Sequence, residues 1–310
     1  MIETTVLTDT KSLKQSTMPL ISIDITILPQ PDFSDMPIDP TLLQTRRPEF
    51  QHYFGDTLEF IAFLTIAPSI KITGHTSLSA AELAASRQHA TRLAAINRPD
   101  DPHLIVTSAL SNTSCLEVEE INFSGICSLR DQSQQPAILS ASALLVCEET
   151  QELILHRRSE SVVTHPNHWH VIGGAMHPQL DLDQGQLNLL KTIQREVQEE
   201  TELTIELDDI PLLSLVKESS NGFIQCAAIG IGISAKTLDD IHDNWEGHTV
   251  RVPFTNLATC LREPLWVPSG KAHVLTWLAL RAMRQAQGDG QLQENSQFNP
   301  EELLTQILRE

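Results

Sequence analysis

The chain has 310 residues, 41% of them hydrophobic and 20% charged, and its formal net charge is −19. A chain of this length and apolar content favours two domains and excludes a largely disordered protein. The acidic excess argues against a nucleic-acid-binding surface, because nucleic-acid phosphates are held by clustered Lys and Arg, and the sequence contains no such cluster. It does not exclude a small phosphorylated ligand, since a bound metal ion can supply positive charge locally.

The cysteines and the apolar runs bear on the cellular compartment. The five cysteines are scattered, odd in number and form no CxxC pair, which is typical of reduced thiols in a cytosolic protein. Residues 1–15 are polar and carry acidic side chains, unlike a signal peptide. No apolar run reaches the roughly 18 residues that a membrane-spanning helix needs. We therefore expect a cytoplasmic protein that does not enter a membrane.

The first half of the chain is predicted to contain several strands and one long helix. Residues 1–18 are expected to be a flexible lead. Residues 77–96 are rich in Ala and free of Gly and Pro, with Ser77 or Ser79 placed to cap a helix whose first turn contains Glu82. Apolar periodicity predicts strands at residues 21–27, 58–66, 103–107 and 116–126.

The polar stretch at residues 131–136 is the predicted domain boundary. We expect a smaller α+β N-terminal domain of unknown role at residues 19–135 and a second domain at residues 136–286. Residues 287–310 are expected to be a linker and a short final helix. Within the second domain, strands are predicted at residues 140–147, 153–158, 168–172, 213–217, 223–233 and 248–254, and helices at residues 186–201, 255–262 and 269–285.

The helix predicted at residues 186–201 ends in a cluster of carboxylates. Glu196, Glu199 and Glu200 are three and four positions apart, so they share a helix face, and each like-charged pair costs about 0.2–0.5 kcal/mol. The dipole at a helix C-terminus also disfavours anions. One explanation is a solvated face on which Arg195 screens Glu199. The other is a hard cation such as Mg²⁺, which takes carboxylate oxygens together with substrate phosphates.

The context of this helix resembles a known family motif. Residues 169–174 (Trp-His-Val-Ile-Gly-Gly), a loop, and residues 195–203 (Arg-Glu-Val-Gln-Glu-Glu-Thr-Glu-Leu) are similar to the Nudix box, G-x5-E-x7-R-E-U-x-E-E-x-G-U, where U is a bulky aliphatic residue. Residues 153–159 and 166–169 also look like the lead-in to the family's Gly-Gly turn. The resemblance covers residues 140–285. It implies an α/β/α sandwich with a mixed sheet, bound Mg²⁺ or Mn²⁺, and hydrolysis of a diphosphate linkage.

The match departs from the motif in three ways. Gly174 and Arg195 are 21 positions apart, whereas the motif formula has 14, so the loop carries about seven extra residues. Counting back from Arg195, the first motif Glu falls on Leu187, and the later motif Gly is Glu202. The resemblance implies that the missing glutamate normally helps to fix the metal-binding helix, so these departures bear on activity.

The resemblance also implies roles for residues of the box. Glu199 and Glu200 are expected as metal ligands, and Glu196 as a third ligand or nearby base. Arg195 is expected to orient the carboxylates. A backbone carbonyl of Gly173 or Gly174 can join the metal ligands, and glycine suits a tight turn that approaches the ligand closely. The metal and catalytic residues predicted from the box are therefore Arg195, Glu196, Glu199, Glu200 and Gly174. Gly173 and Gly174 are also expected to contact the substrate.

Residues outside the box complete the predicted site. Family members often use an acidic residue of a later loop, and Glu246 is the best placed here, with an ordinary turn residue as the alternative. Arg157 and Arg158 follow an apolar strand and can reach a substrate phosphate. Because strand side chains alternate between faces, we expect only one of the two arginines to face the site.

The sequence is also compatible with other interpretations. Four histidines surround the Gly-Gly turn, but their spacing matches no zinc pattern, and strand or loop histidines are favoured. The leading function is a metal-dependent hydrolase of a small diphosphate substrate, in particular a nucleoside diphosphate derivative. A non-catalytic nucleotide-binding sensor is the first alternative, with Leu187 and Glu202 in its favour. An isoprenoid-diphosphate isomerase is the second, although no Cys motif supports it. The sequence leaves a homodimer open.

Overall fold

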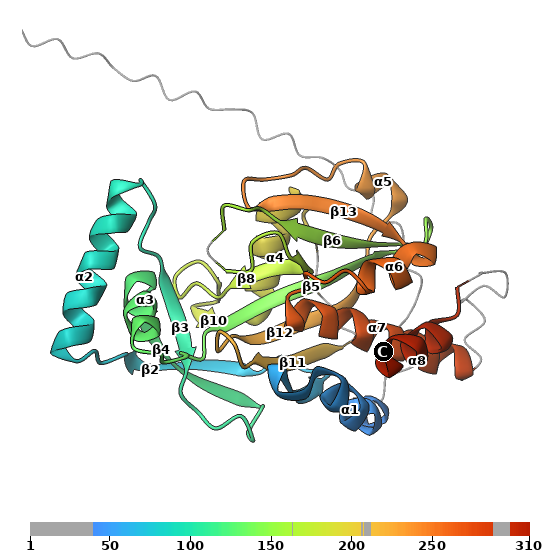
Figure 1. The fold of residues 1–310 in the computed structure, drawn as a ribbon, viewed down its shortest axis with the longest axis horizontal. Coiled ribbons are helices and arrows are strands. Elements are labelled where there is room, and N and C mark those ends of the chain that lie inside the picture. Colours follow the sequence, from blue (N-terminus) through green and yellow to red (C-terminus); the bar gives the residue numbers. More distant parts are fainter. Residues whose placement is uncertain (1–39, 163, 206, 208–211, 288–297) are drawn as a thin grey trace, which may run out of the picture.

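The computed structural model describes residues 40–162, 164–205, 207, 212–287 and 298–310. The predicted lead, the strand predicted at residues 21–27 and most of the predicted C-terminal linker lie outside these ranges. The described part contains one large mixed sheet, a small three-stranded sheet and a two-stranded ribbon. Figure 1 shows the large sheet in the centre of the molecule and the small sheet, with its two helices, at one end.

The large sheet has the strand order β1-β11-β12-β5-β6-β13, and two short strands, β7 and β8, pair with β6 and β5. Only β12 and β5 run parallel, so the sheet is mixed as predicted. Its strands are β1 (Leu58–Leu64), β5 (Leu139–Cys147), β6 (Glu152–Arg158), β7 (Trp169–His170), β8 (Ile172–Ala175), β11 (Leu213–Glu218), β12 (Ile224–Gly232) and β13 (Gly247–Pro253).

Helices cover both faces of the large sheet. On one face, α4 (Leu189–Thr201) contacts β5 and β8, and on the other α7 (Pro268–Ala286) contacts β11 and β12. α1 (Pro40–Phe54) and α8 (Pro300–Arg309) pack beside α7, and Figure 1 shows all three on the near side of the sheet with α4 behind it. Every residue of β5 is buried, which is typical of a central strand covered on both faces. The α/β/α sandwich predicted for the second domain is therefore confirmed.

The small sheet belongs to a compact unit before the large domain. Its order is β2-β4-β3, formed by Ser69–His75, Cys115–Asn122 and Pro102–Val106. The predicted helix is α2 (Ala80–Ala95), and Ser79 and Glu82 form a reciprocal capping box at its start. The strand prediction at residues 116–126 is wrong beyond Asn122, because α3 (Phe123–Asp131) begins there. The distant carboxylate of Asp100 accepts hydrogen bonds from both N–H and Oγ of Ser124, which a local pattern does not reveal.

One strand from the first half of the chain lies in the large sheet rather than in the small unit. β1 pairs antiparallel with β11 at the sheet edge, and α1, which precedes it, packs on α7. α1 and β2 have no counterpart among the predicted elements. The proposed domain boundaries at residues 18, 135 and 286 remain predictions. β1 precedes the proposed boundary at residue 135, but it pairs with β11, which follows that boundary.

The remaining elements are short. The predicted loop at residues 175–185 and the first turn of the helix predicted from residue 186 contain a small hairpin instead, β9 (Leu182–Asp183) and β10 (Gln186–Leu187). Within the described ranges, no helix is long and apolar enough to cross a membrane. The other short elements are η2 (Gly55–Thr57), α5 (Ala235–Leu238), η3 (Phe254–Asn256) and α6 (Leu257–Leu261).

Candidate active site

The carboxylate helix α4 is anchored at both ends. At its start, the side chain of Asn188 accepts a hydrogen bond from the N–H of Leu190 at 2.9 Å. Its apolar face, with Ile193 and Val197 fully buried, packs into the core beneath β5 and β8. At its end, Glu202 has φ of 62° and adopts the left-handed conformation.

The left-handed residue explains one departure from the Nudix box. Glycine is the usual residue at this helix-terminating position because it has no Cβ penalty there. Glu202 keeps the same backbone conformation, and its N–H still bonds to the carbonyl of Gln198 at 3.0 Å. A non-glycine residue in this region costs roughly 1–2 kcal/mol. The change from Gly to Glu202 therefore affects stability and leaves the path of α4 unchanged.

The three predicted carboxylates do not share one environment. Glu196 and Glu200 are buried, whereas the side chain of Glu199 is 53% exposed. Glu200 accepts a hydrogen bond from the N–H of Gly173 at 3.0 Å, and the buried ring of His156 lies with Nδ1 3.6 Å from the same oxygen. The structure therefore brings Glu196 and Glu200 together against β8 and places Glu199 at the solvent edge.

Two glycines of β8 permit this close approach. A Cβ on Gly174 would lie 2.5 Å from both carboxylate oxygens of Glu196, and a Cβ on Gly173 would lie 2.4 Å from that of Ser142. The expected tight turn at these glycines is wrong, because both pair with β5 in a strand that continues to Ala175. Glycine is required here by the nearness of α4 and β5 rather than by a turn.

A carboxylate that the sequence analysis missed holds the arginine of the box. Arg195 donates to both oxygens of Asp181, at 2.7 and 2.9 Å, and also to Glu196 at 2.6 Å and Glu199 at 3.0 Å. Asp181 is fully buried and also accepts from the N–H of His177. Arg195 is thus fixed on one side by Asp181, and its other side orients two carboxylates of α4, as the resemblance implied for this arginine.

The extra residues of the loop explain why counting back from Arg195 missed Asp181. Asp183 pairs with Gln186, and both residues of the turn between them, Gln184 and Gly185, have positive φ. Two such residues are typical of a type I′ hairpin turn. The N–H of Asn188 then bonds to the carbonyl of Asp181 and closes the loop beneath the hairpin. Counted forward from Gly174, Asp181 is seven positions away, one more than the motif glutamate.

The position of Leu187 follows from the same hairpin. It lies in β10 and its side chain is 9% exposed, within the core cluster that also holds Ile193 and Val197. Leu187 is therefore a core residue, and Asp181 is the buried acid that contacts the arginine of the box.

Burial and repulsion between carboxylates raise the pKa values of Glu196, Glu200 and Glu246. Burial raises the pKa of Glu196 to about 8, opposed by Arg195. Burial also raises the pKa of Glu200, with further contributions from Glu196 and Glu246. The pKa of Glu246 is raised by burial, and Arg158 opposes that rise. A nearby cation would stabilise the ionised forms of these carboxylates, because an opposite charge lowers the pKa of an acidic group.

The donor set fits a hard divalent cation. Glu196 and Glu200 present carboxylate oxygens, the ligands that Mg²⁺ prefers. The space above Gly174 that a Cβ would fill directly adjoins the carboxylate of Glu196. Among the described residues, no three His, Cys, Asp or Glu side chains already converge as a complete metal cage. A cation here would therefore draw part of its ligands from the substrate or from water, as Mg²⁺ commonly does.

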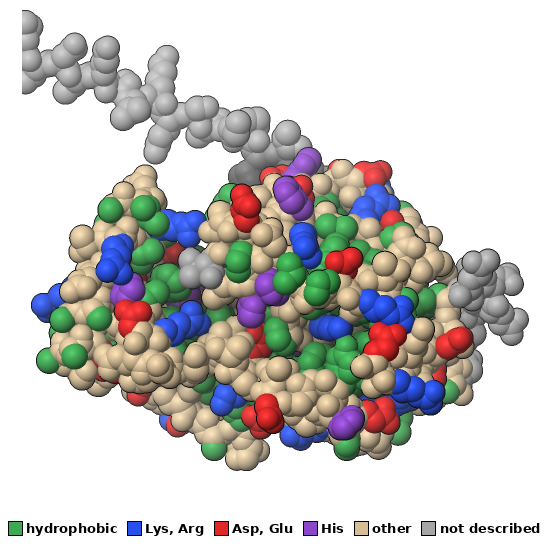
Figure 2. All heavy atoms as spheres, in the orientation of Figure 1, with side chains coloured by type: hydrophobic (Ala, Val, Ile, Leu, Met, Phe, Trp, Pro, Cys, Tyr) green, Lys and Arg blue, Asp and Glu red, His purple; other side chains and the backbone are tan. Residues whose placement is uncertain are grey.

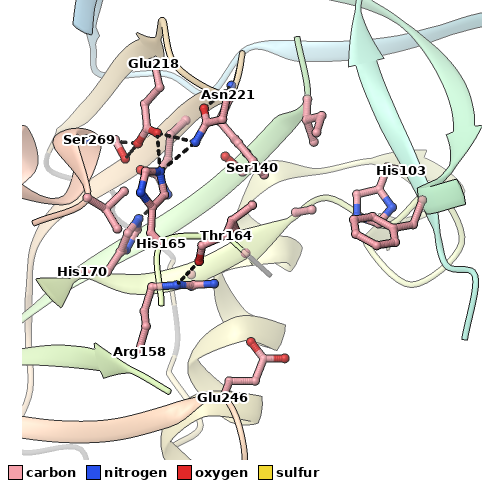
Figure 3. Close-up of a pocket in the computed structure, with 18 of the residues that line it drawn as sticks. His103, Ser140, Arg158, Thr164, His165, His170, Glu218, Asn221, Glu246 and Ser269 are labelled. Atoms are coloured by element: carbon pink, nitrogen blue, oxygen red, sulfur yellow. Dashed lines mark hydrogen bonds and ion pairs between the residues drawn. The ribbon is translucent and has the colours of Figure 1, made fainter. Parts of the chain in front are cut away.

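A cavity of about 200 Å³ opens beside these groups (Figure 3). Gly173, Gly174, Arg158 and Glu246 all line it. Glu246 is held by the side chain of Asn244, which accepts from its N–H at 2.8 Å and donates to the carbonyl of Glu199 at 2.9 Å. The loop that carries Glu246 is therefore fastened to α4.

The two adjacent arginines of β6 have different surroundings, as strand alternation predicts. Arg158 lines the cavity and donates to the carbonyl of Thr164 at 3.1 Å. Arg157 instead lies over the ring of Trp169, 5.1 Å from its centre. Of the two arginines predicted to bind substrate, only Arg158 lines the cavity.

The histidines around the Gly-Gly segment have partners within this chain, and two of them, His165 and His170, also line the cavity. His165 contacts Asn221 at 2.9 Å, His168 bonds to the carbonyl of Pro166, and His177 accepts from two backbone N–H groups of its own turn. His165 belongs to a buried polar network that the sequence did not reveal and that lines the cavity, because its ring also lies 3.4 Å from the carboxylate of Glu218. In it, Glu218 accepts hydrogen bonds from Ser269 and Asn221. These histidines therefore behave as strand and loop residues.

Comparison with known proteins agrees with this geometry. Residues 137–278 match the family model for the NUDIX domain. A search of curated proteins found no match. Similar solved structures include the MutT protein from Methanosarcina mazei Go1 (22% identity, covering 47% of this chain and 94% of that one, TM-score 0.36). They also include DR0079 from Deinococcus radiodurans (16% identity, 56% and 99% covered, TM-score 0.38) and a C. elegans Ap4A hydrolase (13% identity, 48% and 98% covered, TM-score 0.29).

These likenesses to solved structures are distant, and the family assignment rests on the matched segment. That segment begins two residues before β5 and ends within α7, so it contains α4, β8 and the loop with Glu246. Residues 137–278 of this chain therefore form a NUDIX domain.

Proposed function

We propose that this domain hydrolyses a diphosphate linkage in a nucleoside diphosphate derivative, with Mg²⁺ or Mn²⁺ as cofactor. The observation that carries the proposal is the pair of buried carboxylates, Glu196 and Glu200, beside a cavity that also contains Arg158 and Glu246. Burying two like charges side by side is costly unless a cation accompanies them. A divalent metal ion, which also binds phosphate oxygens of the substrate, meets that need.

Each side chain has a role in this proposal. Glu196 and Glu200 hold the divalent cation, with Glu199 at the solvent edge as a further ligand. The cation neutralises charge on the phosphate oxygens and lowers the pKa of the attacking water. Asp181 fixes Arg195, which positions Glu196, and the N–H of Gly173 positions Glu200.

The remaining groups act on the substrate. Arg158 faces the cavity and attracts a diphosphate oxygen. Glu246 also faces the cavity, and because burial raises its pKa, it is suited to accept a proton from the attacking water. None of the five cysteines, all of which lie in the described part, lines this cavity, which disfavours the isomerase alternative.

The test is product release from a panel of nucleoside diphosphate derivatives and isoprenoid diphosphates, each with Mg²⁺, Mn²⁺ or EDTA. We expect turnover of nucleotide derivatives that EDTA abolishes and that Glu196→Gln and Glu200→Gln both remove. Glu263→Gln is the matched control, because this glutamate is exposed and lies outside the cavity. Metal-independent turnover, or full activity in Glu200→Gln, would contradict the proposal, and nucleotide binding without turnover would favour the sensor alternative.

A further inference from the structure

The cavity beside the proposed metal-binding carboxylates also reaches the small N-terminal unit. His103 of β3 and Phe123 and Arg130 of α3 line the same cavity as Arg158 and Glu246. Figure 3 shows His103 far across the cavity from His165 and His170, with Arg158 and Glu246 on a third side. Figure 2 shows a hollow between the two parts of the molecule, with His, Lys and Arg side chains near it. The N-terminal unit therefore supplies one wall of the site.

This wall is fixed relative to the NUDIX domain. The N–H of Val106 bonds to the carbonyl of Ala137 at 2.8 Å, and Ile105 and Ile138 form a bridge, so β3 is fastened to the start of β5. Ser124 is held by Asp100, as described above, which fixes the first turn of α3. The wall is thus continuous with the strand that leads into the catalytic site.

The wall combines aromatic surface with one donor and one acceptor. The rings of His103 and Phe123 lie 5.7 Å apart, and the guanidinium of Arg130 lies 5.8 Å from the ring centre of Phe223. The Nδ1 of His103 donates to the carbonyl of Asp101 at 2.9 Å. Burial lowers the pKa of His103, so the neutral ring keeps Nε2 as an acceptor.

Arg130 is the unusual member of this wall. Its guanidinium donates to the carbonyl of Asn221 at 3.2 Å, and it forms no ion pair with a carboxylate of the described chain. A half-buried cation without a counter-charge retains free donors for a ligand. Flat apolar rings beside a donor and an acceptor match a planar heteroaromatic group, which carries hydrogen-bonding atoms on its edge, better than they match a bare phosphate.

From this arrangement we infer that the N-terminal unit binds the nucleobase of the substrate through Phe123, Arg130 and His103. This inference rests on the proposed function for the diphosphate end of the same cavity. It gives the N-terminal unit a role in selecting substrates by their base. This wall should add no binding affinity for a diphosphate that lacks a base.

The test is calorimetric binding of AMP, GMP, UMP and CMP in EDTA, with inorganic pyrophosphate in Mg²⁺ as the probe that lacks a base. We expect wild type to bind at least one nucleotide and Arg130→Gln and Phe123→Leu each to weaken that binding about tenfold or more. Arg92→Gln, an exposed arginine of the same unit, should change nothing. Pyrophosphate binding should be the same in all four proteins. Melting temperatures check that each variant is folded.

Three outcomes would overturn the inference. Both wall variants could bind the nucleotide as tightly as wild type. Arg130→Gln could weaken pyrophosphate and nucleotide binding equally, which would place a phosphate at Arg130. Wild type could bind pyrophosphate but none of the four nucleotides. Because no arm depends on turnover, an inactive protein whose nucleotide binding follows Arg130 would refute the proposed function and support this inference.

Discussion

Replacing Asp181 tests whether the hairpin-bearing loop supplies the acid that the Nudix box lacks at Leu187. Asp181 is fully buried and accepts two hydrogen bonds from Arg195, whose side chain is 19% exposed. Removing one partner of a buried ion pair costs about 3–5 kcal/mol. Arg195 keeps Glu196 and Glu199 as partners, so for Asp181→Ala we expect the low end, about 3 kcal/mol. Asp181→Asn keeps the shape and should cost about 1.5 kcal/mol.

The effect on activity should exceed the effect on stability. Without Asp181, the guanidinium of Arg195 is free to shift and with it the carboxylate of Glu196. Partners that orient metal ligands typically contribute about 10–100-fold to metal affinity or activity. We expect both variants to lose kcat and Mn²⁺ affinity within this range while remaining folded.

The assays are urea unfolding, Mn²⁺ titration and turnover, with Asp183→Asn as control. Asp183 is exposed in the hairpin and makes no contact with Arg195 that the structure records, so its variant should match wild type. Unchanged metal affinity and turnover in Asp181→Asn and Asp181→Ala would refute the role assigned to Asp181.

Three further predictions follow from the same geometry. Gly174→Ala should abolish turnover, because the new Cβ would lie 2.5 Å from the oxygens of Glu196; wild-type turnover in a folded Gly174→Ala protein would contradict this. Glu202→Gly should raise the free energy of unfolding by about 1 kcal/mol in urea titration, since it relieves a left-handed residue; a loss of stability would contradict this. Burial lowers the pKa of His273 to about 3 against an ordinary value of 6.5, so its neutral form is favoured in the folded chain. Above pH 6.5 His273 is neutral in both the folded and the unfolded chain, so it does not affect the free energy of unfolding. Below pH 6.5 the unfolded chain binds a proton at this residue and the folded chain does not, so the free energy of unfolding falls, by about 2 kcal/mol at roughly pH 5. Urea titrations across this range should show a smaller fall in His273→Gln than in wild type, and equal falls would contradict the assignment.

The sequence predicted the parts of the fold that depend on local patterns. Apolar runs and alternation located the strands of the large sheet, and Ser79 with Glu82 marked the start of α2. Helical spacing also brought Glu196 and Glu200 to one side of α4. It did not predict that Glu199 would be exposed. Helical spacing shows which side chains share a face of α4, but it does not show how much of that face β8 covers.

The rest of the site depends on contacts between distant residues. Asp181 was hidden because the hairpin changes the count from Arg195 without changing where the loop ends meet. The predicted strand runs four residues into α3, because the first turn of this helix is satisfied by Asp100, 24 positions before Ser124, and not by a local capping pattern. Arg130 lines the cavity because β3 packs against the start of β5. The spacing of residues along the sequence does not predict this contact. Cytoplasmic location and a homodimer remain predictions.

The central claim is that Glu196 and Glu200 together bind a divalent cation that serves hydrolysis. The most direct measurement is Mn²⁺ binding, followed by electron paramagnetic resonance, in wild type, Glu200→Gln and the exposed control Glu263→Gln. We predict saturable binding in wild type and the control, and at least about tenfold weaker binding in Glu200→Gln, since the variant removes a charged oxygen ligand. Equal Mn²⁺ affinity in all three proteins would contradict the account.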